Sequence, residues 1–169
     1  MNFLPVGNKA DHIRLTVKNE DTVSIPPGTP VSLMLNGTDD GLAIALPSTN
    51  GAAKAQSAFL GVTLATHAVN DVGTVISFGI VPYALLTVMT RGASSNSWSS
   101  SASVAVGELL AIDTINNAFL LESASLGSNN FLPFAILAGS ISSYAASASA
   151  TSDTRTAIVV GVRVFVRAL

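Results

Sequence analysis

The chain contains no cysteine among its 169 residues. This absence excludes disulfide bonds, thiolate catalysis and cysteine-ligated zinc sites together. It also removes the usual indication of an oxidising or a reducing compartment. A chain of this length is expected to form one domain, with a core large enough to fold alone.

Charge is also scarce. Eight basic and ten acidic residues give a net charge of -2, and charged residues make up 11% of the chain, against about 25% in typical globular domains. A small negative net charge does not provide the basic surface that binds a nucleic acid or an anionic membrane. Hydrophobic residues reach 49%, and the mean hydropathy is +0.53. Such a chain either enters a membrane or has much of its surface covered by other chains.

Long hydrophobic runs are missing as well. A membrane-spanning helix needs about 20 consecutive apolar residues. The best candidate, "FGIVPYALLTVM" (78–89), is shorter and contains Pro82. The opening "MNFLPVGNKADHIR" has Pro5 and Gly7 where a signal peptide would have its apolar region. We therefore expect a cytoplasmic product that buries its surface in an assembly.

What is present is a series of short apolar segments cut by turn residues. In "HIRLTVKNE", Ile13, Leu15 and Val17 alternate with polar residues, which predicts a two-faced strand. The preceding "MNFLPVGN" has no period and is typical of an extended arm. The C-terminal "TAIVVGVRVFVRAL" places alternate valines on one face and arginines with Phe165 on the other.

These segments recur every 8–12 residues or so, as in all-β proteins. We therefore predict an all-β fold, a single barrel or sandwich, with an N-terminal arm and first strand over 1–21 and a β-barrel domain over 22–169. Asn36-Gly37 predicts a hairpin turn, and the alanines of 52–57 favour one short helix. The segment 91–103 is predicted to be a serine-rich loop.

One pattern occurs twice. "IPPGTPVSLML" is followed by strand-forming segments in the same order as those that follow "VAVGELLAIDT", and Gly28 and Gly107 lie 79 residues apart. This spacing indicates a pseudo-repeat of a β-meander, in which each half supplies part of one barrel. Each glycine is expected to mark a tight turn or a bulge before its strand.

Residues that could carry chemistry are few and scattered. His67 near Asp71 could form an oriented base, but no G-x-S-x-G segment supplies a nucleophile, so a histidine at the surface is the favoured reading. Asp39 and Asp40 match only part of the D-x-D-x-D-G pattern of a calcium-binding loop. Glu108, Asp113 and Glu122 fall near the ends of predicted strands. Two of them could form the carboxylate pair of a glycosidase, but the sequence supports this no better than it supports three solvent-exposed side chains. We predict no catalytic residue, no metal and no cofactor.

Trp98 stands alone in a serine-rich segment. An exposed tryptophan there could stack on a sugar or anchor a protein interface, or it could fold back on its own barrel. A carbohydrate-binding β-module of a phage or bacterial surface structure is therefore kept as the alternative function.

The segments "GTPVSLML", "FLGVTLA", "NDVGTVISFGIV", "VGELLAID", "FLPFAILAG" and "AIVVGVRVFVRAL" follow one another over roughly 22–169. In this order they resemble the small head-decoration, or capsid cement, proteins of tailed bacteriophages. The resemblance implies a structural protein that is made in the host cytoplasm, binds the outside of the virion head and ties major capsid protein subunits together. It also implies a homo-oligomer, with a trimer preferred over a dimer. The charge balance and the short apolar runs predict no nucleic-acid or membrane partner. The serine-rich loops and the charged N-terminal segment depart from the family pattern.

Two contacts would follow from such a role. Apolar barrel faces would associate around a symmetry axis. The N-terminal arm, through Phe3, Leu4, Ile13, Leu15 and Val17, would add a strand to a capsid sheet edge. An ordinary first strand in the protein's own barrel is the open alternative for this segment.

Overall fold

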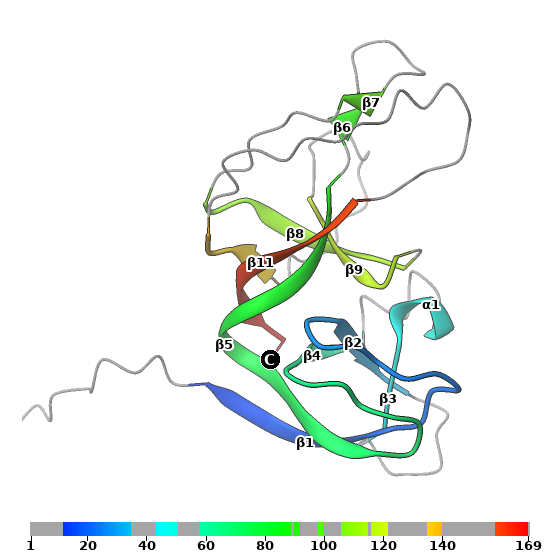
Figure 1. The fold of residues 1–169 in the computed structure, drawn as a ribbon. Coiled ribbons are helices and arrows are strands. Elements are labelled where there is room, and N and C mark those ends of the chain that lie inside the picture. Colours follow the sequence, from blue (N-terminus) through cyan, green and yellow to red (C-terminus); the bar gives the residue numbers. More distant parts are fainter. Residues whose placement is uncertain are drawn as a thin grey trace, which may run out of the picture.

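The computed structural model describes residues 12–34, 43–50, 58–88, 90–91, 98–99, 106–114, 116–121, 135–139 and 158–168. The described part is nearly all β, which confirms the predicted fold class (Figure 1). Its elements are β1 (Ile13–Asn19), β2 (Pro30–Leu33), β3 (Ala43–Ala45), α1 (Pro47–Asn50), β4 (Phe59–Thr63), β5 (Val72–Val88), β6 (Thr90–Arg91), β7 (Trp98–Ser99), β8 (Leu109–Asp113), β9 (Ala118–Leu121), β10 (Ala135–Leu137) and β11 (Ile158–Arg167).

The strands close into two rings that share β5. The first ring runs β1-β3-β2-β4-β5 and closes through the pairing of β5 with β1. The second ring runs β5-β11-β10-β8-β9 and closes through the pairing of β9 with β5. In Figure 1, β5 passes from the first ring, at the bottom, into the second ring, at the top. Closure leaves few unpaired strand edges for unwanted association.

The two rings are built on the same plan, which confirms the pseudo-repeat. The parallel pairing of β1 with β3 is matched by the parallel pairing of β5 with β9, and each antiparallel pairing of the first ring also has a counterpart. Gly28 and Gly107 both have positive φ, at 79° and 97°. The Gly28 N–H donates to the Thr63 carbonyl of β4, and the Gly107 N–H donates to the Leu137 carbonyl of β10, both at 2.9 Å.

The structure corrects one part of this prediction. The two halves do not combine into a single barrel; each half closes a ring of its own, with β5 as the last strand of one and the first strand of the other. The reason is that Val72–Val88 forms one 17-residue strand, β5, which is long enough to serve both rings.

Two bulges shape β5. Ile13 pairs with Phe78 and Arg14 pairs with Ile76, so Ser77 has no residue opposite it on β1. Further along, Val162 pairs with Ala84 and Val164 with Val81. A bulge bends a strand and increases its twist. The second bulge also accommodates Pro82, which has no N–H to donate to a regular strand ladder.

A separate hydrophobic cluster fills the first ring. Each of its five strands contributes a buried side chain to this cluster, which also includes Ile25 and Leu46; the strand residues are Val17, Val31, Ile44, Leu60 and Val75. The match of one residue to each strand shows that the interior of the ring is packed with side chains.

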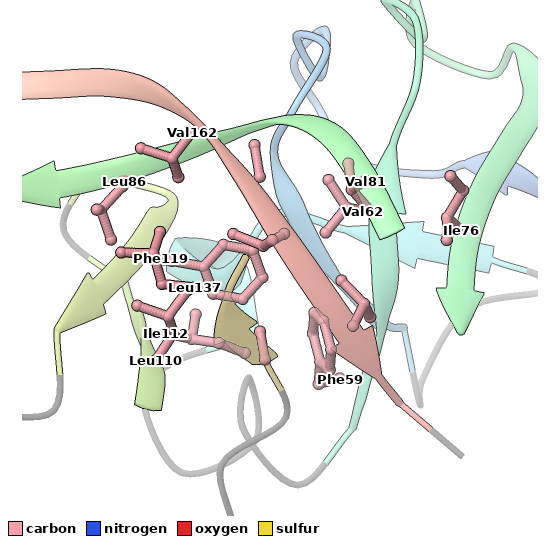
Figure 2. Packing of buried hydrophobic residues seen from close by; sticks show 14 residues of the cluster. Phe59, Val62, Ile76, Val81, Leu86, Leu110, Ile112, Phe119, Leu137 and Val162 are labelled. Atoms are coloured by element: carbon pink, nitrogen blue, oxygen red, sulfur yellow. The ribbon is translucent and has the colours of Figure 1, made fainter. Parts of the chain in front are cut away.

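A larger cluster fills the second ring and extends to the outer wall of the first (Figure 2). Phe119 of β9 and Leu137 of β10 are fully buried in it. Phe59 of β4 packs edge-on against Phe119, with centroids 6.0 Å apart. Both faces of β4 are therefore buried, because Leu60 packs in the first cluster and Phe59 in the second.

The first strand belongs to the barrel. β1 pairs with β5 from Ile13 to Lys18 and with β3 at Lys18 and Asn19. The boundary expected between 1–21 and 22–169 therefore does not separate β1 from the strands that follow, because its backbone pairs with theirs. The remainder of the expected arm, 1–11, lies outside the described residues, as do the predicted helix at 52–57 and the predicted hairpin turn at Asn36-Gly37.

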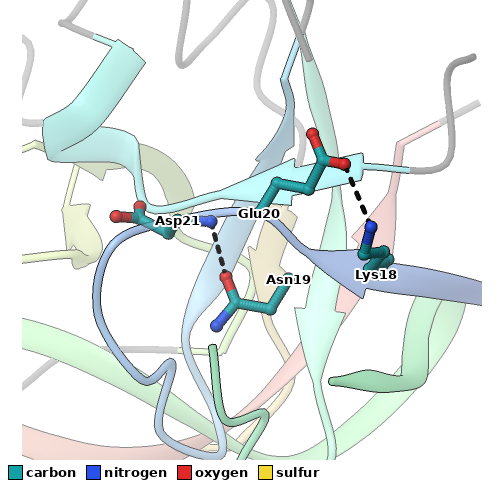
Figure 3. A network of polar contacts seen from close by, with 4 residues as sticks. All are labelled: Lys18, Asn19, Glu20 and Asp21. Atoms are coloured by element: carbon teal, nitrogen blue, oxygen red, sulfur yellow. Dashed lines mark hydrogen bonds and ion pairs between the residues drawn. The ribbon is translucent and has the colours of Figure 1, made fainter. Parts of the chain in front are cut away.

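A buried asparagine fastens the loops at the end of the first ring. The Asn19 Nδ2 donates to the carbonyls of Val23, His67 and Ala68 at 3.0, 3.0 and 3.1 Å. Its Oδ1 accepts from the Asp21 N–H at 2.9 Å (Figure 3). These bonds hold the segment after β1 against the segment before β5, which the sequence alone did not indicate.

Candidate interaction surface

The three apolar residues of the first strand lie at three different depths. Ile13 is 44% exposed, Leu15 is half-buried against the cluster of the first ring, and Val17 is buried within it. The predicted alternation is therefore present, but the Val17 side chain is not available to a partner. Phe3 and Leu4, proposed with them as capsid-binding residues, lie outside the described residues.

His67 and Asp71 are not brought together. The His67 imidazole is 2% exposed and lies directly over Gly73, so the prediction of a surface histidine is wrong. Its Nδ1 has no hydrogen-bond partner among the described residues. The Asp71 Oδ1 instead accepts from the Val72 N–H at 2.9 Å. No hydrogen bond between the two side chains occurs in the described part of the chain, so they do not form the oriented pair that a hydrolase would need.

The other candidate carboxylates are also dispersed. Glu108 is exposed, whereas Asp113 is buried and accepts from the Asn116 Nδ2 at 2.6 Å. Asp39, Asp40 and Glu122 lie outside the described residues. Within the described ranges, no three His, Asp or Glu side chains gather closely enough to hold a metal ion.

Trp98 lies on β7, where its backbone pairs with that of Arg91 on β6. The serine-rich segment 91–103 therefore contains a short strand pair at its described positions, in place of the uninterrupted loop that was predicted. The position of the indole is outside the described part of the structure, so the carbohydrate-stacking role of Trp98 stays a prediction.

A row of apolar side chains crosses the outside of the sheet. The cross-strand register pairs Leu109 of β8 with Ile136 of β10, and Ile136 with Phe165 of β11. Phe165 in turn pairs with Ile80 of β5. Leu109 and Ile136 are 41% and 37% exposed, while Phe165 and Ile80 are half-buried. Paired residues point to the same face of a sheet, so the four side chains form one line.

The line continues onto the first ring. Phe78 packs edge-on against Phe165, with centroids 5.3 Å apart, and it pairs with the exposed Ile13 of β1. We call Ile13, Phe78, Ile80, Phe165, Ile136 and Leu109 the outer apolar row. It crosses five neighbouring strands, which lie about 4.8 Å apart, so the row is about 20 Å long.

The row exists because opposite faces of β5 point into the interiors of the two rings. Val75, on one face, packs in the core of the first ring, and Ile76, on the other, packs in the cluster of the second. After the bulge at Ser77, Phe78 and Ile80 continue the face of Val75 but have passed beyond its core. They therefore reach the outside of the second ring, whose interior is on the other face.

Sequence reasoning had divided the alternation of β11 correctly. Val162, Val164 and Val166 are buried, Arg163 and Arg167 are exposed, and Phe165 between them is half-buried. The row was missed because its members are separated by up to 152 positions in the chain, from Ile13 to Phe165. Alternation within a strand identifies its outer residues, but only the register between strands shows which of them are neighbours.

Models of known protein families give no match to this chain, and no curated protein sequence matches it either. Among the described residues, no helix has the length and apolar character needed to span a membrane.

Proposed function

We propose that this chain is a structural decoration protein of a tailed-phage head, which binds the outer surface of the head and stabilises contacts between major capsid protein subunits. The observation that carries the proposal is the outer apolar row. An apolar surface that crosses five strands is a feature of a protein that docks on another protein. It fits the role that the sequence resemblance implies.

The double ring suits this role mechanically. Its strands are joined by backbone hydrogen bonds around both rings, and each ring has a packed core. A stiff body of this kind can join neighbouring subunits without deforming itself. Many copies, each contributing a modest contact, would together raise the cost of opening the junctions of a pressurised shell.

Self-association belongs to the proposal as well. Low charge and the family resemblance favour a homo-oligomer, with a trimer preferred over a dimer. The segment 1–11 would contribute a further contact with the capsid, through Phe3 and Leu4. Since β1 is a strand of the protein's own barrel, a truncation that tests the segment should remove 1–11 and leave Ile13–Asn19 in place. The truncated chain is expected to bind heads more weakly than the full chain.

The test of the function is reconstitution. Heads of the phage that encodes this chain, prepared without it, are mixed with the purified full chain, sedimented and heated. The chain is expected to cosediment in a saturable way and to raise the temperature at which the heads release DNA. Absence of saturable binding to intact heads would overturn the proposal.

A Trp98→Ala variant distinguishes the proposed capsid-binding function from the alternative, a carbohydrate-binding module. It is expected to bind heads as the wild-type chain does, because Trp98 is on β7, outside the outer apolar row. If the wild-type chain binds glycans on an array and Trp98→Ala abolishes that binding, the carbohydrate-binding module is the better assignment.

A further inference from the structure

The outer apolar row has positive charge on both sides. Arg163 and Arg167 lie two residues before and two residues after Phe165 on β11, and both are exposed. They share the face of Phe165 because the alternate residues Val164 and Val166 are buried. Neither guanidinium has a carboxylate partner among the described residues. In the described part of the chain, the centre of the row is thus an apolar strip between two arginines that lack a carboxylate partner.

These arginines decide between two kinds of occupant. If a second copy covered the row around a two-fold axis near Phe165, Arg163 and Arg167 of both copies would meet across one interface. Two sheets that pack face to face lie about 10 Å apart, and like charges at such a distance disfavour association when water is excluded.

No other described face of a sister copy presents a better match to the two arginines. The exposed carboxylates among the described residues are Asp71 and Glu108. Asp71 precedes β5, at the end of the first ring, whereas Glu108 precedes β8, in the second ring. Glu20 is already paired with Lys18 at 3.4 Å. The described surface therefore offers no apolar strip with a carboxylate on each side.

We infer that the outer apolar row is the docking surface for a different protein, one that presents an apolar strip about 20 Å long with Asp or Glu side chains along its edges. The inference rests on the proposed function, under which that protein is the head's own shell subunit. The apolar strip supplies the buried area, and the two arginines select partners with carboxylates at matching positions. Arginine is suited to this task because its planar group can bind a carboxylate through two hydrogen bonds.

The chain offers matched controls for a test. Arg14 is exposed on β1, and its register partner Ile76 packs in the cluster of the second ring, so Arg14 is on the sheet face opposite to that of Phe78. Val69 is 45% exposed, in the turn before β5. An Arg163→Glu/Arg167→Glu variant is compared with Arg14→Glu, and Ile136→Thr is compared with Val69→Thr. Circular dichroism and thermal unfolding establish that each variant folds.

Binding to undecorated heads is measured for every folded variant at low and at high salt. Arg163→Glu/Arg167→Glu is expected to bind about tenfold more weakly or worse, since it sets carboxylates against carboxylates. Ile136→Thr is also expected to bind more weakly, by about fivefold, because it loses buried apolar surface. Both controls should bind as the wild type does. High salt should weaken the wild type and strengthen the charge-reversed variant.

The outcomes separate the two proposals. If wild-type chain does not bind heads, the proposed function fails and this inference fails with it. If wild-type chain binds but the row variants bind equally well, the function stands and the assignment of the surface is overturned. If Ile136→Thr instead converts a wild-type oligomer into monomers without altering head binding, a second copy occupies the row and the inference is again overturned.

Discussion

Replacing Asn19 by alanine is expected to destabilise the fold by about 3 kcal/mol. The side chain is fully buried; its two amide hydrogens are shared among three backbone carbonyls, and its Oδ1 accepts from one backbone N–H. A hydrogen bond of this kind contributes about 1 kcal/mol net, and a buried N–H left without an acceptor costs about as much or more. Among the groups that Asn19 binds, the Asp21 N–H belongs to a buried residue and has no other acceptor among the described residues.

The loss is limited because two of the carbonyls keep other donors. The His67 carbonyl still accepts from the Ile25 N–H at 2.9 Å and from the Ser24 Oγ at 3.3 Å. The Ala68 carbonyl still accepts from the Asp71 N–H at 3.0 Å. In a chain of this size a change of about 3 kcal/mol lowers the melting temperature by about 6–12 °C, which circular dichroism measures directly. Ser24→Ala is the matched control, since it removes a donor to the same carbonyl from an exposed residue, and it should cost less than about 0.5 kcal/mol.

Asn19→Asp tests the donor role specifically. The new carboxylate keeps the acceptor for Asp21 but turns its second oxygen toward three carbonyl oxygens. Burial beside these carbonyls raises the pKa of the new carboxyl in the folded state above its unfolded value. The variant is therefore expected to be most stable below about pH 4 and to lose stability as the pH rises through the folded pKa. At neutral pH it should be less stable than Asn19→Ala. If Asn19→Asp is as stable as wild type at neutral pH, Asn19 is not acting as the donor that fastens these loops.

Two further substitutions test close packing over glycine. Gly73→Ala places a methyl group where the buried His67 imidazole lies, and the imidazole has little room to move away. We therefore expect the free energy of unfolding, measured in urea, to fall by about 2 kcal/mol. An unchanged urea midpoint would contradict this packing. Gly161→Ala meets the Tyr83 phenol group, which is 50% exposed and can swing into water, so the expected loss is about 1 kcal/mol. In a Tyr83→Ala background Gly161→Ala should cost almost nothing, and additive effects in this double-mutant cycle would refute the contact.

Local features of the fold could be read from the sequence. The alternation from Ile13 to Val17, the alternating faces of β11 and the turn glycines at Gly28 and Gly107 all follow from period-two patterning and glycine's access to positive φ. Their positions 79 residues apart also indicated the repeat. The alternation and the glycine turns depend on residues that are close together in the chain, and the repeat was found by comparing two such local patterns.

Features that depend on strand pairing could not be read in this way. β5 belongs to both rings because β1 pairs in parallel with β3, β9 pairs in parallel with β5, and β5 has bulges at Ser77 and Pro82. None of these features leaves a periodic pattern in the sequence. His67 resembles a surface residue in sequence because it stands beside a turn, yet its backbone bridge to Ile25 and the missing side chain of Gly73 bring its imidazole into the interior.

The unusual composition has two separate causes in this fold. Part of the hydrophobic content is used inside the molecule, because a ring that packs its outer wall on its neighbour needs apolar residues on both faces of a strand, as β4 has at Phe59 and Leu60. That part requires no partner chain. A second part, among the described residues, is the face of β5 that leaves the core of the first ring at Phe78 and emerges on the outside of the second. A face that changes from interior to exterior along one strand would normally become polar after the change, but here it stays apolar through Ile80 and onto Phe165. Folding of the described chain does not require that continuation, and the partner proposed above to cover the row would account for it.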